Sequence, residues 1–185
     1  MKRILAIGAS FTTFALPLAG AGFVVDPGKS SITVKADATG GGFTGTLKKY
    51  KAEIEGNPTT LKPESAKVSW LFADLDTANK DRDAKMLKWL DVGSNPGGEF
   101  SLKRVFDKTV LGKTQTYAFG TIKIHGVSKD IVFPINTARN GKALTIAGQA
   151  VLDTTDFKLP LIRMALIATV KPKLTVIFNL TGTIK

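Results

Sequence analysis

Apolar and polar residues alternate along most of the chain, as they do in strands that bury one face of a sheet. The runs that show this alternation lie at residues 32–37, 68–72, 100–106, 117–124, 131–135, 144–152 and 176–184. Glycine, asparagine and proline residues separate the runs, and Asn140-Gly141 is the strongest hairpin signal among them. The pattern predicts an all-β fold in which short connections join antiparallel strands.

Residues 81–90 interrupt the alternation. Apolar residues recur there at helical spacing, from Ala84 to Leu90, and either Asn79 or Asp81 can cap the first turn. The sequence therefore predicts one short helix inside an otherwise antiparallel β-protein.

About eight strands with one apolar face each are compatible with two architectures, a closed barrel and a two-sheet sandwich. Small residues stand among the large ones on several apolar faces, at Gly120, Gly148, Ala150 and Gly182. Small inward residues let a barrel bend or leave room for a ligand, so the pattern favours a barrel with a cavity.

The N-terminal residues differ from the rest of the chain. Two basic residues precede an apolar stretch at 4–18, and small residues follow at 19–21. This order predicts a secretory signal peptide at 1–21, which leaves 22–185 as a single domain. An uncleaved anchor helix is the less favoured alternative, because the stretch is shorter than the ~20 apolar residues that a membrane span needs.

Composition limits the chemistry that the chain can perform. The 185 residues include no cysteine and one histidine, and the formal net charge is +11. The sequence therefore has no disulfide, thiolate metal site or multi-histidine metal centre, and we expect no metal and no cofactor. An exported protein does not meet nucleic acid, so we expect no nucleic-acid partner despite the positive charge.

A few polar residues are candidates for a site. His125 precedes Gly126 at the junction of two strands, where a turn is the simpler interpretation and a catalytic base the alternative. Asp81 and Asp83 either form an acid–base pair or stabilise the start of the predicted helix. Lysine clusters at 48–51 and 171–173 either protect strand edges or form a basic rim for an anionic group.

Five segments, taken in order, resemble the YceI-like family of exported polyisoprenoid-binding proteins. They are the Asp-Pro opening at 23–27, the Gly-x-Phe segment at 42–47, the Thr-x-Asn and Arg-Asp segment at 76–83, the Asp-Val, Pro and Phe positions at 91–100, and the Ile-His-Gly-Val-Ser-Lys hallmark within 120–129. The resemblance covers residues 23–185. The last segment is the most specific of the five.

The resemblance implies an extended eight-stranded antiparallel barrel, similar to lipocalins, with no catalytic activity. Its hydrophobic tunnel would take a long apolar ligand, such as a polyisoprenoid, a quinone-like tail or a fatty-acid derivative. The implied role is the carriage or storage of lipid in the periplasm. A homodimer is also compatible with this resemblance, and no membrane span is expected after signal cleavage.

The strand pattern and the resemblance together define a candidate ligand site. The expected tunnel lining is Phe43, Trp70, Phe72, Leu87, Phe100, Phe119, Ile124, Phe133 and Phe178. The candidates for contact with a polar head group are Arg82, Lys85 and Arg163. Lys29 and Lys85 stand where the family often has histidine, and residues 157–163 also depart from its common pattern, so the ligand is not defined by the resemblance.

Two other functions fit parts of the sequence less well. A periplasmic hydrolase would depend on His125 or on the Asp81 and Asp83 pair. A small outer-membrane barrel would need aromatic girdles at both membrane interfaces. The two tryptophans and two tyrosines of the chain are too few for such girdles.

Overall fold

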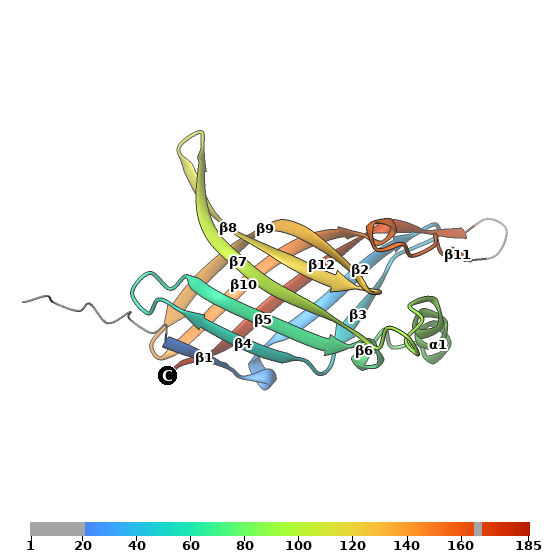
Figure 1. The fold of residues 1–185 in the computed structure, drawn as a ribbon, viewed down its shortest axis with the longest axis horizontal. Coiled ribbons are helices and arrows are strands. Elements are labelled where there is room, and N and C mark those ends of the chain that lie inside the picture. Colours follow the sequence, from blue (N-terminus) through green and yellow to red (C-terminus); the bar gives the residue numbers. More distant parts are fainter. Residues whose placement is uncertain (1–20, 165–167) are drawn as a thin grey trace, which may run out of the picture.

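The computed structural model describes residues 21–164 and 168–185, which form an elongated antiparallel barrel with one helix at one end (Figure 1). The strands are β1 (Ala21–Val25), β2 (Ser31–Ala38), β3 (Phe43–Leu47), β4 (Lys51–Gly56), β5 (Pro63–Leu71), β6 (Leu75–Asp76), β7 (Gly97–Val110), β8 (Lys113–Ile124), β9 (Val127–Asn140), β10 (Ala143–Asp153), β11 (Arg163–Met164) and β12 (Ala168–Ile184). The helix is α1 (Lys80–Trp89). The expected signal peptide lies outside the described residues, apart from Ala21.

The barrel closes because β1 has a partner on each side. Phe23 of β1 pairs with Ile54 of β4 and with Ile184 of β12. The sheet runs from β1 through β4, β5, β7, β8, β9, β10 and β12, and then returns to β1. This order confirms the predicted all-β, eight-stranded antiparallel barrel and excludes the two-sheet sandwich. Closure also removes the exposed edges that an open sheet would have.

Each of the first three long strands of the barrel is divided into two labelled segments by a short interruption. β2 continues β1 after a 3-10 turn at Pro27–Lys29, β3 leads into β4 across residues 48–50, and β6 follows β5 after a second 3-10 turn at Phe72–Asp74. Among the described residues, β6 pairs only with β3. The chain then forms α1 before it enters β7, so a helix lies at this end of the barrel (Figure 1).

Helix α1 begins as the sequence predicts, and the structure shows which residue caps it. The Asn79 side chain accepts a hydrogen bond of 2.9 Å from the backbone N–H of Arg82. Asp81 and Asp83 lie in the first turn, where negative charge complements the positive end of the helix. The apolar face of α1 packs on a cluster that includes Phe72 and Phe157.

The hairpin of strands β7 and β8 forms a two-stranded arm, residues 104–117, whose outer part extends beyond the barrel (Figure 1). The register between them shifts after Leu102, where one extra residue of β7 forms a bulge opposite Gly120 and Phe119. Bulges bend and twist a strand, and the arm leaves the barrel at this point. β8 pairs with β9 only from Thr116 onward, so the outer part of the arm has no third strand.

Two-residue turns join the last long strands. His125 and Gly126 have φ angles of 49° and 71°, and the flanking residues Ile124 and Val127 pair with each other. His125 therefore occupies a tight hairpin turn, as the simpler interpretation predicted, and its Nδ1 lies 3.1 Å from the Phe157 carbonyl oxygen. The predicted hairpin at Asn140-Gly141 is also present, with Gly141 as the first central residue of the turn.

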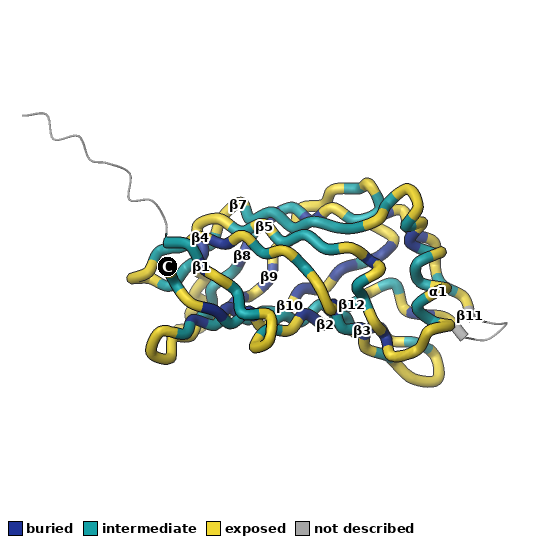
Figure 2. The backbone as a smooth tube through the Cα atoms, turned by 90° about the horizontal axis from the view of Figure 1, so that it is seen from below, coloured by how far each residue is buried: buried dark blue, intermediate teal, exposed yellow. Residues whose placement is uncertain are grey.

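Buried residues occur along the whole length of the barrel (Figure 2). Phe23 and Leu144 belong to the cluster that fills the barrel at the β1 end, and neither of them lines the internal space. From Ile146 and Leu180 toward α1, the inward-pointing residues line an internal space. The fold therefore has a packed end and an end with an internal space.

Candidate ligand-binding cavity

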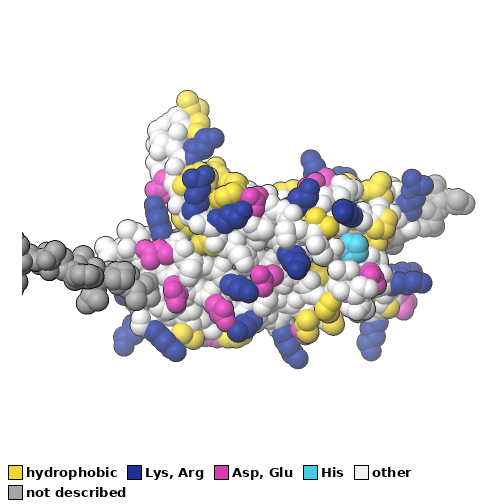
Figure 3. Space-filling view, viewed as in Figure 1, with side chains coloured by type: hydrophobic (Ala, Val, Ile, Leu, Met, Phe, Trp, Pro, Cys, Tyr) yellow, Lys and Arg dark blue, Asp and Glu magenta, His cyan; other side chains and the backbone are white. Residues whose placement is uncertain are grey.

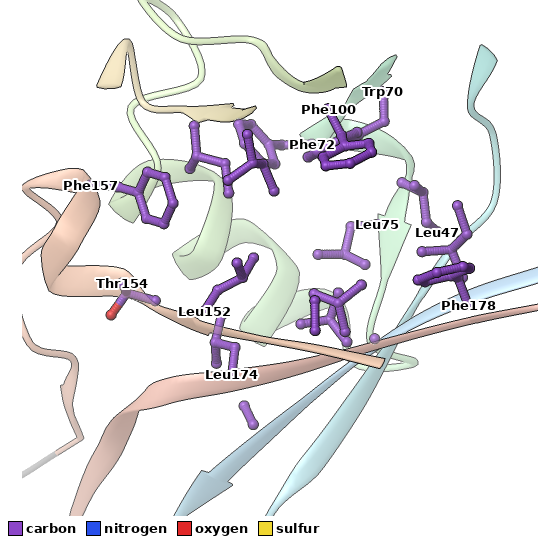
Figure 4. A pocket seen from close by; sticks show the side chains of 18 of the residues that line it. Leu47, Trp70, Phe72, Leu75, Phe100, Leu152, Thr154, Phe157, Leu174 and Phe178 are labelled. Atoms are coloured by element: carbon purple, nitrogen blue, oxygen red, sulfur yellow. The ribbon is translucent and has the colours of Figure 1, made fainter. Parts of the chain in front are cut away.

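The barrel encloses a cavity of about 1060 Å³ between the packed end and α1. Pockets for small ligands occupy roughly 300–1,000 Å³, so this cavity is at the upper end of that range and has room for a large ligand. Inward-pointing residues of the barrel strands form its walls, and residues of α1 complete the lining at the helix end. Figure 4 shows labelled side chains from several strands pointing into the space beside the helix.

Aromatic rings form much of the wall. The aromatic lining residues are Phe43, Trp70, Phe72, Trp89, Phe100, Phe133, Phe157 and Phe178. The Phe133 ring lies between two others, with centroid distances of 5.5 Å to Phe100 and 5.8 Å to Phe178. Such rings offer large, rigid apolar surfaces.

Glycines lie beneath several of these rings. A Cβ atom on Gly120 would lie 2.6 Å from the Phe100 ring, and one on Gly148 would lie 2.5 Å from the Phe178 ring. Both distances are shorter than any ordinary carbon contact, so the rings can lie against the wall only because these residues have no side chain. The small residues thereby help to keep the lumen open.

Charge is confined to one end of the cavity. Among the lining residues, the charged ones are Asp81, Arg82 and Lys85 of α1, Arg163 of β11 and Lys171 of β12. They approach from two sides, one formed by α1 and the other by the strands β11 and β12. The remainder of the described lining consists of uncharged and mainly apolar side chains. The cavity therefore has an apolar interior and a polar mouth.

Arg82 is held in place by contacts within the protein. Its Nε donates a 2.8 Å hydrogen bond to the Thr77 hydroxyl, and its Nη2 donates one of 2.6 Å to the Thr77 carbonyl. The guanidinium also lies 4.5 Å from the centre of the Phe43 ring. Asp83 accepts hydrogen bonds from the Thr77 hydroxyl and N–H. Arg82 therefore connects α1 to the barrel, in addition to its place at the mouth.

Lys85 and Arg163 have fewer contacts within the protein than Arg82 has. Both side chains are exposed at the mouth, and neither forms an ion pair or side-chain hydrogen bond with a described residue. Lys171 lies 3.5 Å from Asp37 in a solvent-exposed pair. Lys85 and Arg163 are consequently the mouth cations best placed to meet a charged group on a ligand.

The structure brings most of the expected site residues together. Those that line the cavity are Phe43, Trp70, Phe72, Phe100, Ile124, Phe133, Phe178, Arg82, Lys85 and Arg163. Their contact with a ligand stays a prediction.

The placement of Phe119 and Leu87 differs from the expectation. Phe119 has the opposite strand parity to Ala118, which lines the cavity, and its ring lies on the outer surface near Lys103 and Arg104. Leu87 is half-buried and packs within the cluster between α1 and the barrel, outside the lining.

Several lining residues were not among the expected ones. Met86 and Trp89 reach the cavity from α1, and Phe157 reaches it from the turn after β10. The indole Nε1 of Trp89 donates a 2.8 Å hydrogen bond to the Pro160 carbonyl, which orients the ring. Leu152 and Leu174 continue the inward parity of β10 and β12. The same alternation that predicted the strands indicates these two leucines.

Two further features limit the chemistry of the described residues. They contain no cluster of three or more carboxylate or histidine side chains suited to a metal ion. None of their helices has the length and apolar character required to cross a bilayer.

The fold and the cavity define a class of protein, the closed antiparallel barrel with an apolar lumen and a polar mouth. Within that class the chain belongs to the YceI-like family, because the YceI-like domain matches residues 23–182. No curated protein gives a significant sequence match.

Solved structures share the fold at low sequence identity. BcnA of Burkholderia cenocepacia is 21% identical, with a TM-score of 0.74 over 86% of this chain and 100% of that one. The YceI protein of Campylobacter jejuni is 18% identical, with a TM-score of 0.62 over 100% of this chain and 99% of that one. A polyisoprenoid binding domain from Saccharophagus degradans is 10% identical, with a TM-score of 0.64 over 90% and 99%.

Proposed function

We propose that this protein binds a long apolar lipid of the polyisoprenoid, quinone or fatty-acyl type in the barrel and carries or stores it in the periplasm. The observation that carries the proposal is the polarity of the cavity, which is apolar over its depth and charged only at the mouth. The similar barrel from Saccharophagus degradans is described as a polyisoprenoid binding domain, which supports the same ligand class.

The free energies of apolar burial and of ion pairing indicate different roles for the tail and the head group of the ligand. Each buried methylene contributes about 0.8 kcal/mol, so the tail of a long lipid supplies most of the affinity. An exposed ion pair contributes about 0–1 kcal/mol. Lys85 and Arg163 would therefore set the orientation of a lipid with an anionic head more than its affinity, and the apolar tail would enter first.

The alternatives fit the structure less well. For a hydrolase, His125 occupies a hairpin turn and Asp83 accepts two hydrogen bonds from Thr77, so neither is positioned as an unengaged acid or base. For an outer-membrane barrel, the interior would be polar and the exterior apolar, which is the reverse of the polarity found here. The proposal therefore assigns a binding role without catalysis. The N-terminal pattern at 1–21 supports export to the periplasm.

Native mass spectrometry of the protein from the periplasmic fraction, followed by organic extraction, tests the proposal. We expect a stoichiometric adduct with a polyprenyl, quinone or acyl mass. The double variant Lys85→Gln/Arg163→Gln should keep a neutral isoprenoid alcohol and lose about two- to fivefold in affinity for each cation toward its phosphate. A clean unliganded mass that also fails to take up added isoprenoids and fatty acids would contradict the proposal.

A further inference from the structure

The arm (residues 104–117) has features that the cavity does not explain. Its tip presents Val110 and Leu111 to solvent, with 54% and 98% of their surfaces exposed. Figure 3 shows hydrophobic side chains at the end of the arm and basic side chains below them. An apolar tip that projects this far from the barrel contributes nothing to the core.

The backbone conformation at the tip makes leucine an unusual residue at position 111. Leu111 and Gly112 have φ angles of 51° and 75°, and Val110 pairs with Lys113 across the turn. Such a turn favours asparagine, aspartate or glycine at its first central position, because a branched apolar side chain is strained in the left-handed conformation. Neither packing nor turn geometry accounts for a leucine here.

The two faces of the arm differ in character. Cross-strand pairs place Phe106 opposite Tyr117, Lys108 opposite Gln115 and Val110 opposite Lys113 on one face. The alternate residues, which form the other face, include Asp107, Thr109, Thr114 and Thr116. Phe106 and Tyr117 stack with a centroid distance of 5.7 Å. The arm is therefore an amphipathic ribbon with one aromatic and basic face.

The charges of the arm have one dominant sign. It carries Arg104, Lys108 and Lys113, and its one acidic residue, Asp107, bonds to Lys62 at 2.6 Å and to the Thr116 hydroxyl at 2.8 Å. An apolar tip, an aromatic pair and flanking cations are the features with which peripheral proteins enter the interface of an anionic membrane.

We propose that the arm docks the protein on a membrane that contains anionic lipids, with Val110 and Leu111 inserted among the head groups. Lys108 and Lys113 contact lipid phosphates, and the stacked pair Phe106–Tyr117 lies at the level of the interface. This docking does not depend on a lipid in the cavity, because the arm and the mouth are separate parts of the barrel.

A membrane fits the arm better than a second copy of the chain does. A stable protein interface buries roughly 1,200–2,000 Å² in total, which a two-residue tip and a narrow ribbon do not provide. Two copies that met through this face would also bring lysines together. An anionic surface complements the same lysines.

Sedimentation with extruded vesicles of phosphatidylethanolamine and phosphatidylglycerol tests the role of the tip. The variant Leu111→Asn should lower the partition coefficient by at least about tenfold, since a buried leucine side chain is lost from the interface. Its denaturation midpoint should stay the same or rise, because asparagine suits the turn. Val151→Asn, at another exposed valine, is the matched control and should bind as the wild type does.

A second measurement reports the arm itself and is insensitive to binding by other segments. The chain has no cysteine, so Leu111→Cys and Val151→Cys each give one site for an environment-sensitive fluorophore. We expect a blue shift at position 111, and none at 151, when phosphatidylglycerol vesicles are added. The variant Lys108→Gln/Lys113→Gln should weaken binding roughly fivefold for each lysine, and high salt should remove this difference.

Three results would overturn the proposal. The first is wild-type partitioning of Leu111→Asn. The second is an unchanged emission at position 111 in the presence of the vesicles. The third is a blue shift at 111 that grows with protein concentration in the absence of vesicles, which would show that a second copy covers the tip.

Discussion

Gly148 lies directly opposite Phe178 in the β10–β12 ladder, and the Phe178 ring occupies the space that a side chain on Gly148 would fill. A Cβ atom there would also lie 2.7 Å from the Pro134 carbonyl oxygen. The pair shows how a wall of large rings and an open lumen coexist, because the ring takes up the space of the side chain that its neighbour lacks.

Replacing Gly148 with alanine should therefore push the Phe178 ring toward the lumen. We expect a loss of about 1–3 kcal/mol in the free energy of unfolding, as for other overpacked sites. Uptake of longer isoprenoids should fall more than uptake of shorter ones. Urea denaturation and native mass spectrometry with ligands of two lengths measure both effects. Gly93→Ala is the control, because a Cβ atom there meets no atom within 4 Å.

Substituting Phe133 and Phe119 with serine should separate the inner surface from the outer one. Phe133→Ser removes a buried ring that contacts two other lining rings, so we expect a loss of about 3 kcal/mol and a lower ligand content per folded molecule. Phe119→Ser should leave the ligand content unchanged. Equal loss of ligand in both folded variants would contradict the assignment of the two faces.

Arg82 should act on α1 through its shape as well as its charge. Arg82→Lys keeps the charge but loses the paired hydrogen bonds to Thr77 and the stacking on Phe43. We expect Arg82→Lys and Arg82→Gln to speed amide hydrogen exchange in residues 80–89 to a similar extent. The faster exchange would correspond to a loss of about 1–3 kcal/mol in the free energy of local unfolding. Lys88→Gln, an exposed position on the same helix, is the control. Protection that survives in Arg82→Lys would show that charge alone suffices.

Tyr50 should limit stability in alkaline solution. Burial raises the pKa of its hydroxyl above the ordinary value of about 10. The neighbouring Ser30 hydroxyl lowers this pKa by less than burial raises it. The Tyr50 hydroxyl has no hydrogen-bond partner among the described residues.

The sign of the effect follows from proton binding. The folded protein holds the Tyr50 proton more tightly than the unfolded chain, so this contribution is present below pH 10 and is lost as the pH rises through the folded pKa. Tyr50→Phe should remove this alkaline loss and leave stability at pH 7 equal or slightly higher. Thermal denaturation between pH 7 and 11 measures it. Tyr117→Phe, the same change on the arm, should keep the alkaline loss.

The alternation of apolar and polar residues predicted the antiparallel strands, and the helical spacing at 81–90 predicted the helix, because burial of one face gives each element its period. Alternation alone left the barrel and the sandwich open, since the order of the strands depends on pairing between distant segments. The size of Phe119 was misleading, because this large aromatic residue stands on the outer face of β8, where Lys103 and Arg104 lie over its ring. Strand parity separates the two faces, since Phe119 is out of phase with Ile122 and Ile124, which line the cavity.

The role of Arg82 depends on geometry that the sequence does not contain. Its position in the predicted helix suggested contact with a head group, which stays a prediction, and the structure adds the bonds to Thr77 and the stacking on Phe43. The length of the arm was equally hidden, because its alternation continues smoothly past the bulge at which it leaves the barrel.

The helix at the mouth is attached to the barrel by side-chain contacts and not by strand pairing. Elsewhere in the described barrel, neighbouring strands share ladder hydrogen bonds, and their separation would require cooperative unfolding of the sheet. The contacts of α1 with its surroundings are side-chain packing, its cap and the bonds of Arg82, Asp83 and Trp89, so we expect it to detach at a fraction of the global unfolding free energy. Mutation at Asn79 or Arg82 should therefore change how often α1 detaches from the mouth of the cavity, while the barrel itself stays folded.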